Sequence, residues 1–313
     1  MVAPNRQFGI SRLMILSHYT DRGGLEGIAR SKAFWATNFL NVNDTTEYFF
    51  AWKQIIGHAL DAMLSQLPVD LKRADIDLEA HTTASIEQFR SFVNPMEGYG
   101  HLYVTSFARG QTPDHEERGI LTLWDRYTNL EGYCLQFEQT DVTRILELEA
   151  SKASYAWLGL ANIKYGIDES EREFKELSFQ LSQKLLLRVA QDRPDRRLDI
   201  QFEKMWPDST FEQRTMRFCA THKDPCYEDE REMRIFGYPA EKTQIQFLTG
   251  IASKKPIQKT ATGKKYIIVG NIWRPGIEPC RIIIGPRANP DIAKILAMFA
   301  HPPVVAHADL PIV

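Results

Sequence analysis

Runs of β-branched, aromatic and aliphatic residues recur along the chain and predict short strands. The runs lie at residues 12–19, 33–37, 102–107, 132–137, 161–165, 230–238, 266–269 and 281–284. Two long stretches between them, at about 48–97 and 168–218, are helical in pattern or composition and predict helical inserts. No internal repeat and no linker of Gly, Ser or Pro divides the chain. The pattern therefore predicts an α+β protein with a single domain over residues 1–313, in which two helical inserts split the sheet.

Local signals refine the helices and loops. Asp21 precedes Leu25 and Ile28, so it is the expected N-cap of a short helix that ends near residue 31. Residues 47–67 carry apolar side chains near a 3.6-residue period and predict a long amphipathic helix. The polar segment 111–118 predicts a loop, and an aromatic segment follows at 121–127.

Composition and charge narrow the classes of protein. Apolar residues make up 43% of the chain and charged residues 25%, and the formal net charge of -2 argues against a domain that holds nucleic acid by overall charge. The four cysteines form no CxxC pair, which argues against a zinc knuckle. No other feature of the sequence implies a metal site. No apolar run approaches the roughly 18 residues that span a bilayer, so we expect no membrane segment and a cytoplasmic protein.

Common catalytic motifs are missing from the sequence. It contains no GxxxxGK(S/T) loop, no GxGxxG after the first strand, no GxSxG and no HExxH. The candidates that remain are polar and aromatic side chains near the ends of predicted strands.

His18, Tyr19 and Thr20 end the first predicted strand. His18 and Thr20 alternate with Tyr19, so both can point to one side and hold a hydroxyl or an amide of a ligand. The alternative is a core histidine with an internal partner.

Two further groups have a structural alternative. Asn43 and Asp44 precede a helix, where capping alone explains them. Trp124 and Tyr127 are three residues apart and share a face if the segment is helical, a spacing typical of core aromatics.

The segment 227–236 (YEDEREMRIF) is the most suggestive. In an extended chain Glu230, Glu232 and Arg234 share one face, roughly 6.6–6.8 Å apart. Two carboxylates so placed can stabilise a sugar cation and orient an acceptor. The alternative is a solvated edge strand whose Glu and Arg side chains pair across the ladder.

Taken in order, several segments resemble the family that carries domain of unknown function 2971. They are LSHYT at 16–20, LEGI at 25–28, FWA at 34–36, NDTTE at 43–47, LWDRY at 123–127, EGYCLQF at 131–137, KDP at 223–225, EREMRI at 230–235 and RIIIGP at 281–286. Two departures stand out: Thr45-Thr46 replaces the Pro-Phe usual in that family, and Met233 replaces its usual Trp.

That family in turn looks like the His-Tyr-Glu branch of the ADP-ribosyltransferase superfamily. The resemblance implies a split β-sheet core of that type and NAD as the substrate. His18 would hold the nicotinamide-side ribose, and the Tyr19 backbone with Thr20 would hold the carboxamide. Glu232 would be the catalytic carboxylate, and Glu230 would orient the acceptor.

The resemblance leaves the aromatic that stacks on NAD open among Tyr48, Trp35 and Trp124. Asn43, Asp44 and Tyr127 complete the set of residues expected around the cofactor.

The leading hypothesis is therefore an NAD-dependent ADP-ribosyltransferase that modifies a macromolecule, protein or nucleic acid, as a bacterial toxin or phage-defence effector. One alternative is an NAD glycohydrolase. Another is a non-catalytic sensor domain that binds a nucleotide or a nucleic acid. Residues 253–265 contain five lysines and no acidic residue, which fits contact with phosphates or simply an exposed hairpin.

Overall fold

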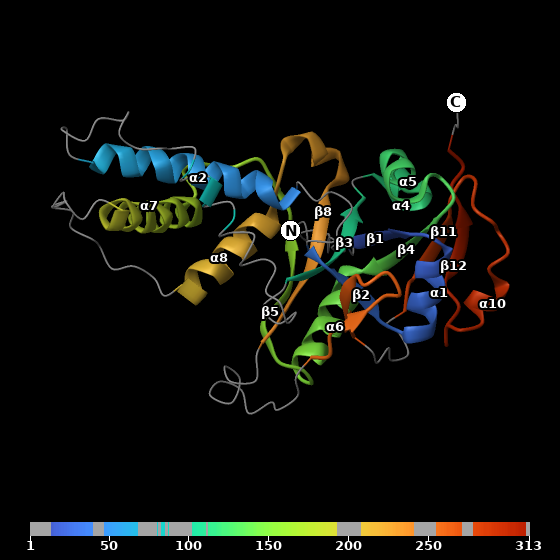
Figure 1. Ribbon diagram of the computed structural model, residues 1–313. Coiled ribbons are helices and arrows are strands. Elements are labelled where there is room, and N and C mark those ends of the chain that lie inside the picture. The colour runs from blue at the N-terminus through green and yellow to red at the C-terminus, as the bar shows by residue number, and fades with distance from the viewer. Residues whose placement is uncertain are drawn as a thin grey trace, which may run out of the picture. The chain divides into compact units, whose positions relative to one another are not determined.

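A computed structural model describes residues 14–39, 47–67, 102–110, 112–192, 208–240, 255–270 and 278–310, with single positions at 80, 83, 84 and 87. It contains a large mixed β-sheet together with helices (Figure 1), which confirms the α+β class. The more specific ADP-ribosyltransferase-like arrangement stays a prediction.

The chain folds as two compact units, each assembled from separate stretches of sequence. The first comprises Met1–Phe34, Ser106–Glu149 and Val269–Val313, and the second comprises Trp35–Thr105 and Ala150–Ile268. The boundaries fall within strands β2, β3 and β10 and near the end of helix α6. The expectation of one domain over residues 1–313 stays a prediction.

Antiparallel pairing around β1 organises the first unit. Its strands are β1 (Ile15–Thr20), the end of β3 (Tyr103–Arg109), β4 (Tyr133–Glu138), β11 (Arg281–Ile284) and β12 (Val304–His307). Its helices are α1 (Arg22–Ser31), α4 (Pro113–Arg118), α5 (Leu121–Thr128), α6 (Gln139–Ala150) and α10 (Ala293–Leu296). The strand order is β12-β11-β4-β1-β3, and β1 pairs with β4 over its whole length.

The expected cap of the first helix is confirmed. The Asp21 carboxylate accepts a hydrogen bond from the Gly24 amide at 2.7 Å, and Lys32 closes α1 in the left-handed conformation. A Cβ atom at position 24 would lie only 1.9 Å from Thr20 Oγ1, so a larger residue than Gly24 would require Thr20 to move. The end of β1 and the first turn of α1 therefore pack closely.

The loop predicted at 111–118 is wrong, since Pro113–Arg118 forms α4. The Thr112 hydroxyl accepts from the His115 amide at 3.1 Å, and Pro113 occupies the first helical turn, where its missing N–H costs nothing. Capping chemistry thus forms a helix that has no apolar stripe.

The second unit combines strands with long helices. Its strands are β2 (Phe34–Asn38), β5 (Tyr155–Asn162), β6 (Lys164–Tyr165), β7 (His222–Lys223), β8 (Glu232–Pro239), β9 (Gln258–Lys259) and β10 (Lys265–Val269). Its helices are α2 (Glu47–Gln66), α7 (Arg172–Asp192), α8 (Asp208–Thr221) and the 3₁₀-helix η3 (Pro225–Glu230). β5 and β8 form a long antiparallel pair, and β6 and β7 form a short parallel one.

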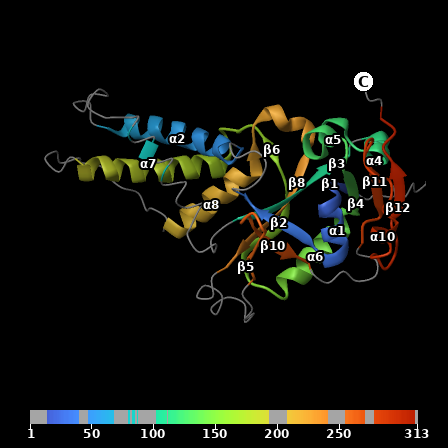
Figure 2. The same ribbon diagram turned by 45° about the vertical axis from the view of Figure 1, so that its right-hand side comes forward.

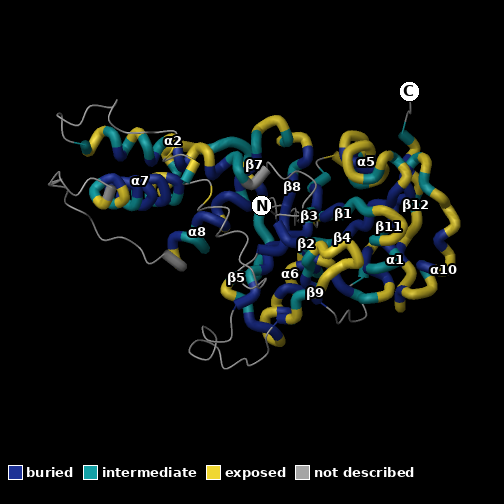
Figure 3. Tube along the Cα trace, in the orientation of Figure 1, coloured by how far each residue is buried: buried dark blue, intermediate teal, exposed yellow. Residues whose placement is uncertain are grey.

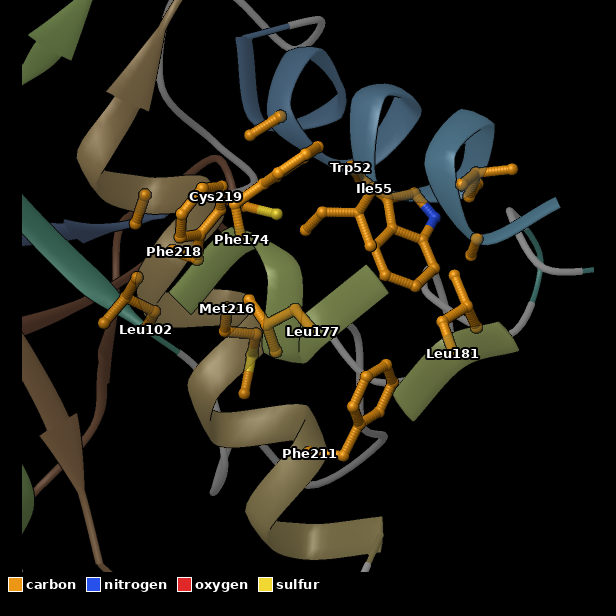
Figure 4. Packing of buried hydrophobic residues seen from close by; sticks show 14 of the residues in the cluster. Trp52, Ile55, Leu102, Phe174, Leu177, Leu181, Phe211, Met216, Phe218 and Cys219 are labelled. Carbon is orange, nitrogen blue, oxygen red and sulfur yellow. The ribbon is translucent and has the colours of Figure 1, made fainter. Parts of the chain in front are cut away.

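The two regions predicted as helical inserts pack against each other. In Figures 1 and 2, α2 runs alongside α7, and α8 lies next to them. The close view in Figure 4 shows Trp52 of α2, Leu177 of α7 and Phe211 of α8 in one apolar cluster, all almost fully buried. Burial of these side chains, worth about 1.5–3 kcal/mol each, makes the separate sequence regions one helical layer.

Candidate functional site

A short 3₁₀-helix between two strands shapes the region that holds the predicted carboxylates. Lys223 ends β7, and Asp224 caps η3 by accepting from the Cys226 amide at 2.9 Å. Arg231 then adopts a left-handed conformation with φ 46°, which ends η3 and redirects the chain into β8. Glu230 therefore lies at the end of η3, close to Lys223.

The strand predicted from residue 230 is thus wrong in its first residues. β8 begins at Glu232, because the Asp-Pro pair that starts η3 and the positive φ of Arg231 interrupt the extended chain. The predicted common face of Glu232 and Arg234 is correct, since their side chains contact each other.

Four charged side chains meet here, and we call Lys223, Glu230, Glu232 and Arg234 the charge cluster. The Lys223 ammonium lies 2.6 Å from Glu230 Oε2 and 3.2 Å from Glu232 Oε2. Arg234 donates two parallel hydrogen bonds to the Glu232 carboxylate, from Nε to Oε1 at 2.5 Å and from Nη2 to Oε2 at 2.8 Å. Such a bidentate pair fixes the plane of the carboxylate.

Backbone and aromatic groups surround the charge cluster. Arg234 Nη1 donates to the Ala220 carbonyl at 3.3 Å, and the Glu232 amide donates to the Tyr165 hydroxyl at 2.7 Å. Burial raises the pKa of Tyr165 to about 12, so this hydroxyl is neutral at ordinary pH. The Lys223 ammonium also lies 4.7 Å from the centre of the Tyr227 ring.

The cluster is almost completely removed from water. The four side chains are 3–4% exposed, and two positive charges balance two negative ones. Desolvation costs several kcal/mol per ion, and buried ion networks can often be replaced by apolar residues without loss of stability. A buried cluster of this kind is therefore weak evidence for stability. It is the candidate functional site because it brings together Glu230 and Glu232, the two carboxylates that the sequence singles out.

His18, in the first unit, has a defined tautomer. Its Nδ1 lies 2.9 Å from the Ser106 carbonyl oxygen, which can only accept, so Nδ1 carries the proton. Burial lowers the pKa of His18 below its ordinary value of 6.5. The imidazole is thus neutral at pH 7, and its Nε2 is an acceptor.

Tyr19 and Trp124 use their side chains to hold the α4–α5 region. The Tyr19 hydroxyl accepts from the Ile120 amide at 2.7 Å, and Trp124 Nε1 donates to the Arg118 carbonyl at 2.9 Å. The two rings meet edge to face with centroids 5.0 Å apart, and Trp124 is fully buried. Trp124 therefore packs in the core.

The other predicted aromatics differ in position. Trp35 is 42% exposed and stacks on Tyr266, with ring centroids 5.0 Å apart. Tyr127 lies on α5 with Trp124 but is 37% exposed. Asn43, Asp44 and the side chain of Tyr48 lie outside the described residues.

The predicted residues are therefore divided between the two units. His18, Tyr19, Thr20, Trp124 and Tyr127 belong to the first unit, and Trp35, Glu230 and Glu232 belong to the second. Sequence reasoning gave no role to Lys223, Arg234 or Tyr165. The motif segments at 223–225 and 230–235 contain the first two, whereas the position of Tyr165 depends on the pairing of β6 with β7.

Among the described residues, no group of three or more His, Cys, Asp or Glu side chains is placed to hold a metal ion. None of the helices in these ranges is both long and apolar enough to cross a bilayer. Comparison with protein-family models, curated proteins and solved structures gives no match. The likeness to the family of domain of unknown function 2971 stays a hypothesis.

His18 predicts a pH dependence of stability. Because its pKa is lowered in the folded protein, the unfolded chain takes up a proton first as the pH falls through about 6.5. His18 therefore lowers the free energy of unfolding as the pH falls from 7.5 to 5. His18→Asn keeps a donor toward Ser106 and should lose less stability over this range. Urea unfolding of the wild type and of His18→Asn at both pH values measures the difference. Equal losses of stability in the two proteins would contradict a lowered pKa of His18.

Two ion pairs of equal length predict unequal effects on stability. Lys164 Nζ lies 2.6 Å from Glu171, as Lys223 Nζ does from Glu230, but the Lys164 side chain is 58% exposed. Lys223→Met strands a buried carboxylate and should cost about 3–5 kcal/mol. Lys164→Met should cost about 0–1 kcal/mol.

Denaturant unfolding of both variants tests this. Lys223→Met combined with Glu230→Gln should recover part of the loss, because the excess negative charge is gone. If Lys223→Met and Lys164→Met lose the same free energy of unfolding, burial does not determine how much the Lys223 ion pairs contribute to stability.

Proposed function

We propose that this chain is an NAD-dependent ADP-ribosyltransferase that moves the ADP-ribosyl group of NAD to a macromolecular acceptor. The observation that carries the proposal is the buried pairing of Glu230 and Glu232 around Lys223, with Arg234 on Glu232. A role as a bacterial toxin or phage-defence effector belongs to the same proposal and rests on the resemblance of the sequence.

In the proposed reaction, the bond between ribose C1′ and the nicotinamide nitrogen breaks. Its electron pair leaves with nicotinamide, so positive charge develops on the ribose. The Glu232 carboxylate accepts a hydrogen bond from the 2′-hydroxyl and stabilises that charge more in the transition state than in the ground state. A nucleophilic atom of the acceptor bonds to C1′, and its proton passes to Glu230 and then to solvent.

The geometry of the cluster supports these roles. Arg234 fixes the plane of the Glu232 carboxylate, so little reorganisation remains for the reaction itself. Of the two Lys223 contacts, the one to Glu232 is longer, 3.2 Å against 2.6 Å to Glu230. We propose that the ribose hydroxyl replaces this longer contact.

The roles proposed for His18, Tyr19 and Thr20 follow the resemblance. The unprotonated Nε2 of His18 supports a contact with a ribose hydroxyl, because a neutral imidazole can accept that proton. The Tyr19 side chain already supports the Ile120 amide, so any contact with the carboxamide falls to its backbone and to Thr20.

The positive and negative charges of the cluster neutralise one another, and this favours a second candidate function. Two cations and two carboxylates that neutralise one another can hold β7, η3 and β8 together without any substrate. The chain would then be a non-catalytic domain that binds a nucleotide or a nucleic acid. The two candidates differ in whether NAD is consumed.

Nicotinamide release from NAD by the purified protein separates the candidates. Glu232→Gln keeps the shape of the side chain and should lower release by about 10²–10³-fold. Glu171→Gln is the matched control, since Glu171 also forms ion pairs in this unit but lies outside the cluster, and it should retain activity. Glu230→Gln should lower transfer to the acceptor more than hydrolysis.

Labelled ADP-ribose followed into cell lysate then gives the class of acceptor. The transferase proposal fails if folded wild-type protein releases no more nicotinamide than folded Glu232→Gln. That outcome would favour the non-catalytic domain.

A further inference from the structure

Arg231 lies between the two carboxylates of the charge cluster, Glu230 and Glu232, where η3 turns into β8. In Figure 3 the chain passes there from a largely exposed stretch, η3, into the buried strand β8. The backbone of Arg231 is left-handed, with φ 46° and ψ 48°. Gly or Asn would make the same turn with less strain, so the turn alone does not explain an Arg at this position. A long side chain kept in such a conformation points to a functional role.

The Arg231 guanidinium has no partner in the part of the chain that the structure describes. It forms no ion pair and no hydrogen bond there, although four carboxylates lie within three residues of it in the sequence (EDE at 228–230 and Glu232). Its Nη1 atom is buried without an acceptor, which lowers stability because the group has lost its water. The residue as a whole is partly exposed, so a ligand can approach the rest of the guanidinium.

Other cations in comparable positions are engaged. Lys32 also has a positive φ, but its ammonium donates to a backbone carbonyl. Arg234 donates two hydrogen bonds to Glu232, and Lys223 pairs with both carboxylates of the cluster. Within the described ranges Arg231 is therefore left with a charge that no side chain of the protein neutralises. An anion from outside the chain would supply the missing counterion.

We propose that the Arg231 guanidinium binds a phosphate group of the nucleotide substrate. A guanidinium presents its N–H donors in a planar fork that matches the oxygens of a phosphate. In NAD a phosphate is attached to the same ribose whose 2′-hydroxyl we assign to Glu232, so two successive residues would serve neighbouring groups of one ligand. The inference rests on the proposed function for the identity of that nucleotide.

Calorimetric titration of the purified protein with ADP-ribose tests the phosphate contact without turnover. Arg231→Asn should weaken binding by about 10- to 100-fold, because a hydrogen-bonded contact between charged groups is lost. Adenosine has no phosphate, so the variant and the wild type should bind it equally. Arg231→Lys keeps the charge but not the planar fork and should give an intermediate affinity. Arg188→Gln removes the same charge from an exposed position on α7 and should leave binding unchanged.

Arg231→Asn also separates ligand binding from folding, because Asn adopts the left-handed conformation more readily than Arg. Without nucleotide, its midpoint of urea unfolding should equal or exceed that of the wild type, since strain is relieved and the buried Nη1 atom is removed. A midpoint clearly below that of the wild type would show that Arg231 serves the fold, and would overturn the proposal.

Kinetics distinguish a failure of this proposal from a failure of the proposed reaction. Arg231→Asn should raise KM for NAD with little change in kcat, whereas Glu232→Gln should lower kcat. Nicotinamide release with an unchanged KM in Arg231→Asn would overturn the phosphate site and leave the reaction standing. ADP-ribose binding that needs Arg231, in a protein that releases no nicotinamide, would support the phosphate site and overturn the reaction. If folded wild-type protein does not bind ADP-ribose, the phosphate site is wrong.

Discussion

The burial of four charges in the second unit constrains where β7, η3 and β8 can lie, although the net contribution of these charges to the free energy of unfolding is small. Lys223 bridges two carboxylates, and any displacement of β7 or η3 would leave an ion in a low-dielectric interior without its partner. This constraint explains the parallel pairing of β6 with β7, which sets Tyr165 beside Lys223. It also explains the left-handed Arg231, which lets Glu230 turn back while Glu232 begins a strand.

The first unit uses its buried polar groups in another way. His18 and Tyr19 each form a hydrogen bond with a backbone group far along the chain, at Ser106 and Ile120, whereas Trp124 bonds to the nearby Arg118 carbonyl. These bonds join β1 to β3 and to the start of α5, and they join α5 to the end of α4, which leaves little of the Tyr19 or Trp124 side chain for a ligand. Exposure instead favours Trp35 as an aromatic that can meet a ligand. Trp124 thus packs in the core, as its spacing from Tyr127 indicated, whereas Trp35 and Tyr127 remain exposed.

Periodicity predicted the elements that carry a regular apolar pattern. The helix expected over 47–67 is α2, and the strand expected at 281–284 is β11. α4 was not predicted, because a capped polar helix has no apolar stripe to detect. The alternation of Glu232 and Arg234 gave their shared face but not their burial, since the same alternation fits a solvated edge. Contacts with Lys223 depend on a positive φ and on a two-residue parallel ladder, which no local pattern reveals.

The central claim is that the charge cluster is retained for chemistry rather than for stability. Replacing all four charges by apolar residues (Lys223→Met, Glu230→Leu, Glu232→Leu and Arg234→Met) tests it by the free energy of unfolding. The account predicts a variant as stable as the wild type, or more stable by about 1–4 kcal/mol, because desolvation no longer opposes folding. A loss of about 3–5 kcal/mol, as expected when one charge is stranded, would show instead that the cluster is needed to hold the fold.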